Sequence, residues 1–297
     1  MYARVLSVLA LVFLVFSGGA NALEARQVVT TENADYFGFD LRSEQNVTLD
    51  QCKTSCLGDR QCRAFTYNTK AKWCFLKSDF ATIKPFNGAV AGKVVRVSGD
   101  PDIGAPPALS FFPAWMADES ASMRQRLTNG SIAVGEQGLA GLADAGDSAF
   151  LTGDPRTAVQ RFTAAIAISP DDSSLWSRLA RATLAVKGIN YQETAQLKTD
   201  ASSAAYNAYL VSRTAPARAD ALAVLASALD NRDLFRPALQ AYEASLALLN
   251  SASVRAEYED LKARKGFRVI QHTVEADSAS PRVCAQFSED LVKAGVD

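Results

Sequence analysis

The segment LDQCKTSCLGDRQCRAFTYNTKAKWCFLK, residues 49–77, contains four of the five cysteines of the chain. Just before it, Thr48 stands three residues ahead of Gln51, which is the spacing of a capping box. A short helix is therefore predicted to begin at Thr48 and to end near Gly58.

Runs of aromatic and β-branched residues on both sides of this helix indicate strands. Residues 64–67 and 73–76 are two such runs, and a polar turn separates them. Residues 36–41 and 92–97 are further strand candidates. The expected domain, residues 23–98, is a helix packed on a small antiparallel sheet.

The four clustered cysteines permit three disulfide pairings. We prefer Cys52–Cys74, which joins the helix to a strand, and Cys56–Cys62, which joins the helix end to the next loop. The Cys52–Cys74 disulfide would close the longer of the two loops, and it is expected to stabilise the domain by about 3 kcal/mol in the chain-entropy model. The alternative is a four-cysteine zinc site, against which the spacing argues because it lacks two short Cys pairs.

At these residues the sequence resembles the PAN/Apple family. The pattern is Cys52-x3-Cys56-x5-Cys62, the strand 64–67 and then Cys74-Phe75-Leu76, and it covers about a quarter of the chain. The resemblance implies the fold, the disulfides and a non-enzymatic role in binding proteins or carbohydrates. A spacer without a ligand is the other interpretation.

The N-terminus has the pattern of an export signal over residues 1–22. Arg4 gives a positive start, residues 5–16 are apolar, and residues 20–22 form a small-residue cleavage site. We expect a periplasmic or secreted protein in an oxidising compartment, with no transmembrane span after cleavage. An uncleaved anchor is the alternative.

The composition excludes several classes of function. The 297 residues are 48% hydrophobic and 21% charged, with a formal net charge of -1, so no positive field would hold a nucleic acid. His272 is the single histidine, which argues against histidine metal sites and leaves a catalytic triad dependent on one residue. No nucleotide-binding glycine loop occurs. We therefore expect no enzyme activity, no metal and no cofactor.

A proline-rich linker is predicted over residues 99–118, and helical repeats over residues 119–265. The second repeat copy begins 46 residues after the first, although a tetratricopeptide repeat has 34, so extra residues are expected around 188–199. A helix over 254–265 is expected to cap the array. The copies resemble tetratricopeptide repeats at these positions: Ala158, Phe162, Ala165, Pro170; Ala204, Ala208, Val211, Pro216; Ala238, Tyr242, Ser245, Asn250.

Such repeats usually present a concave groove lined by the first helix of each pair. By register, the possible groove contacts are Asp147, Phe150, Arg181, Leu184, Asp220 and Asp230. This face is expected to be either a docking groove for a peptide or domain, or the solvated face of a spacer.

Residues 266–297 read as two strands, the start of an incomplete β domain. Cys284 is the odd cysteine of an exported chain and so suggests a partner elsewhere. The run Cys284-Ala285-Gln286-Phe287-Ser288-Glu289 resembles the opening of the first macroglobulin-like β-sandwich of bacterial alpha-2-macroglobulins. The expectation is that the chain is the front of a longer protein.

The fold class expected is multidomain α+β: a disulfide-stapled domain, all-α repeats, then the first strands of a β-sandwich. The leading hypothesis is the N-terminal interaction region of a periplasmic alpha-2-macroglobulin-like protease inhibitor, which the resemblance implies would trap proteases through its longer parent chain. The alternative is a free-standing secreted adaptor that binds carbohydrate or protein.

Overall fold

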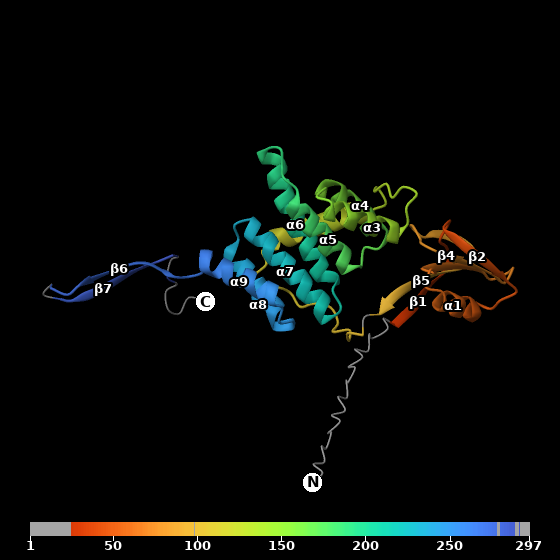
Figure 1. Ribbon diagram of the computed structural model, residues 1–297, viewed down its shortest axis with the longest axis horizontal. Coiled ribbons are helices and arrows are strands. Elements are labelled where there is room, and N and C mark those ends of the chain that lie inside the picture. Colours follow the sequence, from red (N-terminus) through yellow and green to blue (C-terminus); the bar gives the residue numbers. More distant parts are fainter. Residues whose placement is uncertain (1–24, 98, 278–279, 289–290, 292–297) are drawn as a thin grey trace, which may run out of the picture.

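The computed structural model describes residues 25–97, 99–277, 280–288 and Leu291. The predicted export signal lies outside these residues. Figure 1 shows three parts along the chain: a disulfide domain (residues 25–97), a repeat region (residues 99–265) and a pair of strands, β6 and β7. The disulfide domain and the strand pair lie at opposite ends of the repeat region.

The disulfide domain is a five-stranded antiparallel sheet with one helix on one face. The strand order across the sheet is β1-β5-β3-β4-β2. Its elements are β1 (Ala25–Asp35), β2 (Asp40–Gln45), α1 (Leu49–Gly58), β3 (Ala64–Asn68), β4 (Trp73–Lys77) and β5 (Lys84–Val97).

Helix α1 begins where the capping box predicted. The Thr48 side chain accepts from the Gln51 backbone N–H, and the Gln51 side chain accepts from the Thr48 backbone N–H. The buried face of α1 carries Cys52 and Cys56. These pack with four side chains from the facing side of the sheet: Phe65, Tyr67, Leu76 and Val90.

Both disulfides of the domain connect to this helix. Cys52 is joined to Cys74 on β4, and Cys56 to Cys62 in the loop before β3. These are the preferred pairs, and all four cysteines are fully buried. The zinc-site alternative is therefore wrong, because each thiol is taken up in a disulfide.

The strand predicted over 36–41 is largely wrong. Residues 36–39 form the turn between β1 and β2. Gly38 and Phe39 both have positive φ, at 84° and 57°, and this left-handed backbone cannot continue a strand. The long strand β1 was missed, because its run of polar residues lacks the alternation that marks a half-buried strand.

The repeat region consists of helical hairpins in tetratricopeptide-like order. Helices α3 and α4, α5 and α6, and α7 and α8 pack as consecutive pairs, and α9 covers α8. The helices are α2 (Ala114–Thr128), α3 (Leu139–Leu151), α4 (Pro155–Ile168), α5 (Ser173–Ala185), α6 (Tyr191–Val211), α7 (Ala215–Asn231), α8 (Phe235–Leu248) and α9 (Ala252–Lys265).

Small residues allow the close packing that the repeat pattern predicted. Ala158 and Ala204 are fully buried, and the rings of Phe162 and Trp176 fill the space between helices. Asp154 caps α4 by accepting from the Thr157 N–H at 3.1 Å, with Pro155 at the first helical position.

Two features of the repeat region differ from the prediction. Helix α2 begins at Ala114, inside the predicted linker 99–118, and its Met116 and Met123 enter the core. The extra residues of the second copy do not form a loop around 188–199. They lengthen α6 to 21 residues, against 14 for α4 and α8, so its first turns project beyond the neighbouring helices (Figure 1).

The proline-rich segment before α2 lies against the repeats and does not act as a free spacer. The Ile103 N–H donates to the Arg213 carbonyl at 2.8 Å, and the Tyr209 hydroxyl donates to the Pro107 carbonyl at 2.6 Å. Phe112 stacks on Tyr206 with ring centroids 3.9 Å apart.

The two predicted strands near the end of the chain are present. Strands β6 (Val269–Glu275) and β7 (Arg282–Phe287) pair antiparallel. Their side chains are exposed, apart from the partly buried Phe287.

Candidate functional site

The candidate groove lies between helices α5, α7, α8 and α9 and has a cavity volume of about 280 Å³. Of the six predicted groove residues, it brings together Arg181, Leu184 and Asp220. The lining also includes serine side chains at 227, 251 and 253, with Val254 and Glu257.

Ion pairs join the first helices of successive repeats along this face. Asp147 on α3 lies 3.1 Å from Arg178 on α5, and Asp230 on α7 lies 3.3 Å from Arg264 on α9. Between these two pairs, Arg181 on α5 is paired with Asp220 on α7.

The Arg181 and Asp220 side chains are 43% and 44% exposed, so water screens their attraction. An exposed pair of this kind contributes about 0–1 kcal/mol. Arg181 and Asp220 therefore line the groove as a pair and are available to a ligand at little cost to the fold.

The predicted residue Phe150 lies outside this groove. It lines a second, more open hollow with Arg156 and Lys187, at the ends of α3 and α5. The six predicted residues thus divide among the groove, the second hollow and the flanking ion pairs.

The wall of the groove contains a hydrogen-bonded network that sequence reasoning missed. The Tyr242 hydroxyl lies 3.0 Å from Ser227 Oγ and donates to Glu257 Oε2 at 3.0 Å. Burial raises the pKa of Tyr242, and the neighbouring Glu257 carboxylate adds to this effect. The Tyr242 hydroxyl therefore keeps its proton over the physiological pH range. Its hydrogen bond fixes Glu257 of α9 at the edge of the groove. No sequence signal marks Glu257, because the sequence predicts this helix only as the cap of the array.

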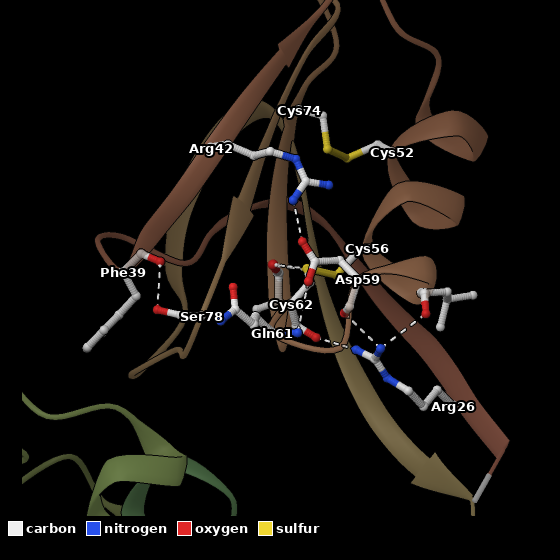
Figure 2. The surroundings of a disulfide bond; sticks show 12 residues. Arg26, Phe39, Arg42, Cys52, Cys56, Asp59, Gln61, Cys62, Cys74 and Ser78 are labelled. Atoms are coloured by element: carbon white, nitrogen blue, oxygen red, sulfur yellow. Dashed lines mark hydrogen bonds and ion pairs between the residues drawn. A yellow bond between two sulfur atoms is a disulfide. The ribbon is translucent and has the colours of Figure 1, made fainter. Parts of the chain in front are cut away.

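In the disulfide domain, two arginines hold the end of α1 (Figure 2). Arg26 on β1 donates to the carbonyls of Leu57, Asp59 and Cys62. Arg42 on β2 pairs with the Asp59 carboxylate and holds the pKa of that carboxyl below its usual range, with a further contribution from the Gln61 N–H. These contacts tie the Cys56–Cys62 loop to both edges of the sheet.

The disulfide domain also caps a helix of the repeat region. Asp79, in the loop between β4 and β5, accepts from the Ala140 and Gly141 N–H groups at 3.0 and 2.9 Å. The Phe80 carbonyl accepts from the Leu139 N–H at 2.8 Å. Helix α3 has Gly138 at its N-cap and no cap from its own side chains, so the preceding domain supplies the partners for its first N–H groups. We call these contacts the Asp79 cap.

Some chemistries find no support in the part of the chain that the structure describes. Within it, no three His, Cys, Asp or Glu side chains gather in a way that could hold a metal ion. No described helix has the length and apolarity needed to cross a membrane. Cys284 is an exposed free thiol on β7, and His272 is exposed on β6.

The family comparison bears on the disulfide domain. Residues 27–94 match the PAN domain family. The disulfide domain is a PAN domain. The match covers α1, both disulfides and the five strands of the PAN domain, apart from the start of β1 and the end of β5. No curated protein matches the chain.

Solved structures similar to the chain are helical repeat proteins. The first TPR of Spaghetti (RPAP3), bound to an HSP90 peptide, is 18% identical with a TM-score of 0.36, covering 42% of this chain and 94% of its own. The Sgt2 TPR domain of Aspergillus fumigatus is 21% identical with a TM-score of 0.37, covering 42% and 78%. MamA is 16% identical with a TM-score of 0.36, covering 51% and 79%.

Proposed function

We propose that the chain is a non-enzymatic, exported protein-interaction region whose repeats dock a peptide segment of a partner protein in the α5–α7–α8–α9 groove. The observation that carries this proposal is the groove itself, to which four helices contribute side chains. Two disulfides in the PAN domain support export to an oxidising compartment.

The charges of the groove restrict the peptide it can hold. Arg181 is the single cation among the described lining residues, and Asp220 neutralises it. A carboxylate on the peptide would find no unpaired cation here, and it would lie near the like-charged Glu257 carboxylate. The serine and valine side chains of the wall fit a segment of small apolar and hydroxyl-bearing residues, with at most one cationic side chain directed to Glu257.

Removing the central ion pair tests the groove. An Arg181→Ala/Asp220→Ala variant should keep its fold, because an exposed pair contributes about 0–1 kcal/mol. Its affinity for a docked peptide should fall about tenfold, because both side chains line the cavity. The probe is a peptide selected from a random phage-displayed library on the wild-type chain, with Kd measured by calorimetry.

The matched control is Arg156→Ala/Glu193→Ala, which removes a pair of similar geometry, 2.7 Å apart, outside the groove. It should leave the peptide Kd unchanged. Equal binding by wild type and the Arg181→Ala/Asp220→Ala variant would contradict docking in this groove and favour the spacer interpretation.

We further propose that this region belongs to a periplasmic alpha-2-macroglobulin-like protease inhibitor. The order of export signal, PAN domain, repeats and the Cys284 strand supports this proposal. In such a protein the region would position or retain the inhibitor, and the trapping of proteases would take place in the parent chain. The competing candidate is a free-standing PAN–repeat adaptor.

An immunoblot of the periplasmic fraction separates these two candidates. An antibody raised against residues 119–265 should detect a species several times larger than 297 residues account for. A band that matches the 297 residues without the signal would instead establish the adaptor. Detection only in the cytoplasmic fraction would contradict export and both candidates.

A further inference from the structure

A cleft lies between the PAN domain and the repeat region and has a cavity volume of about 650 Å³. One wall belongs to the PAN domain and includes Arg63 and residues 93–95. The other wall comes from α3 and from the two turns that join α4 to α5 and α6 to α7. A volume of this size is typical of small-ligand pockets, which often lie at domain interfaces. We call this space the interdomain cleft.

We infer that the interdomain cleft binds a small aliphatic dicarboxylate, which bridges the two domains. Three cationic side chains line the cleft: Arg63 and Lys93 on the PAN wall, and Arg213 on the repeat wall. Within the part of the chain that the structure describes, none of these three side chains has an ion pair or a hydrogen bond. They are therefore available to a ligand.

The sheet directs the two cations of the PAN wall toward the repeats. Lys93 lies opposite Ala64 in the register of β5 and β3, so the two side chains share one face of the sheet. Ala64 packs in a cluster that includes side chains from α3 and α4. Arg63 stands directly before β3, and its carbonyl accepts from the Val94 N–H at 2.8 Å. Arg63 and Lys93 thus come from neighbouring backbone positions on the wall.

Arg213 on the opposite wall lies in a turn whose backbone is held in place. Its carbonyl accepts from the Ile103 N–H at 2.8 Å, and the following residue, Thr214, caps α7. The preceding residue, Ser212, donates its hydroxyl to the Tyr209 carbonyl at 2.6 Å. A guanidinium fixed in this way can hold a carboxylate through two parallel N–H···O bonds.

Most carboxylates of the cleft already have partners. The cleft is lined by four of them: Asp79, Asp144, Asp171 and Asp172. Asp79 forms the Asp79 cap, and Asp171 pairs with Arg124 at 2.7 Å. Asp172 is the N-cap of α5 and accepts from the N–H groups of residues 174 and 175. Among the described residues, Asp144 alone of the four has no partner.

The charge left for a ligand is therefore positive. Arg178 is the fourth cation of the lining, and it pairs with Asp147 at 3.1 Å. Three free cations thus face one free carboxylate, an excess of two positive charges. A dianion would neutralise this excess, whereas a monoanion would leave half of it and a cation would add to it.

The cleft also offers an apolar surface. Val94 and Val95 line it on the PAN side, and Leu139, Leu175 and Val211 line it on the repeat side. The methylene groups between two carboxylates would leave water by packing against these side chains. Inorganic phosphate has no apolar part and would leave this surface uncovered.

Calorimetric titration of the full chain with succinate, adipate, suberate and sebacate tests the inference, with hexanoate and inorganic phosphate as comparison probes. At least one dicarboxylate should bind more tightly than either comparison probe. Arg63→Gln and Arg213→Gln should each weaken its binding about tenfold, because each removes a charge-assisted bond to one carboxylate. Both side chains are exposed, so the variants should keep the fold.

A second measurement tests whether the ligand bridges the domains. At a dicarboxylate concentration of about 100 times Kd, the backbone amides of residues 139–141 should exchange with solvent about a hundredfold more slowly. These amides lie at the Asp79 cap, and a ligand that contacts both walls binds only while the domains are in contact.

Arg60→Gln serves as the control, since Arg60 is an exposed arginine of the PAN domain that does not line the cleft. This variant should bind the dicarboxylate as the wild type does. The inference would be overturned if no dicarboxylate bound, if binding survived both Arg63→Gln and Arg213→Gln, or if hexanoate or phosphate bound equally well. Binding that left the exchange of residues 139–141 unchanged would overturn it as well. The result is independent of the repeat groove, which the Arg181→Ala/Asp220→Ala variant tests separately.

Discussion

A Cys52→Ala/Cys74→Ala variant is expected to lose about 3 kcal/mol of PAN-domain stability and to unfold that domain locally. The disulfide closes a separation of 22 residues and links α1 to β4 inside the buried face of the sheet. In the chain-entropy model, a loop of this length contributes about 3 kcal/mol, and a small domain has little core with which to compensate.

Hydrogen exchange followed by mass spectrometry measures this effect by region. Peptides from β3, β4 and β5 should exchange about a hundredfold faster in the variant, since each tenfold corresponds to about 1.4 kcal/mol. Peptides from α7 should be unchanged, because they lie in the separate core of the repeat region.

The second disulfide supplies the comparison. A Cys56→Ala/Cys62→Ala variant opens a separation of only six residues, for which the same model gives about 2 kcal/mol. The arginine contacts of the loop remain in that variant. If the Cys56–Cys62 variant were the less stable of the two, loop entropy would not be the main contribution of these disulfides.

A Gly138→Ala variant should weaken the attachment of the PAN domain to the repeat region. A Cβ atom at this position would overlap the Asp79 carboxyl group, so the Asp79 cap could not form as it stands. Two N–H···O⁻ bonds would be lost, each contributing about 1.5–3 kcal/mol. The backbone amides of residues 139–141 should exchange with solvent more than a hundredfold faster than in the wild type.

Gly141→Ala is a closely matched control. Its Cβ would lie 3.6 Å from Asp79 Oδ2, an ordinary contact, and alanine favours a helix over glycine by about 0.5–1 kcal/mol. Gly138→Ala should thus destabilise the protein, whereas Gly141→Ala, three residues later, should stabilise it. Asp79→Asn, which keeps an acceptor but loses the charge, should lie between Gly138→Ala and wild type. A loss of protection in Gly141→Ala equal to that in Gly138→Ala would contradict the role of the cap.

Much of the fold follows from local patterns in the sequence. The capping box at Thr48, the cysteine spacing and the Asp154-Pro155 helix start are signals contained within a few residues, and each predicted its element. The repeat period predicted the paired helices because each hairpin buries the same small and aromatic positions. Strand β1 and the start of helix α2 were missed, since neither has a clear local pattern.

The candidate sites depend on contacts between distant residues, and only part of them could be predicted. The repeat register predicted Arg181, Leu184 and Asp220 as groove residues, because each lies on the first helix of a repeat. The Asp79 cap could not be predicted, because it joins residues from separate elements. Asp79 and Ala140 are 61 residues apart, and the only local sign is a helix start at Gly138 without a capping side chain.

The Asp79 cap has a consequence for binding strength. It holds the PAN domain against the repeat region with its groove, so the two parts do not move on a flexible tether. A partner that contacts both the PAN domain and the repeat groove would engage the second surface intramolecularly after the first. For closely linked sites the local ligand concentration is of the order of millimolar, which turns two weak contacts into a long-lived attachment. Loss of the cap would leave each individual affinity unchanged and would reduce this avidity.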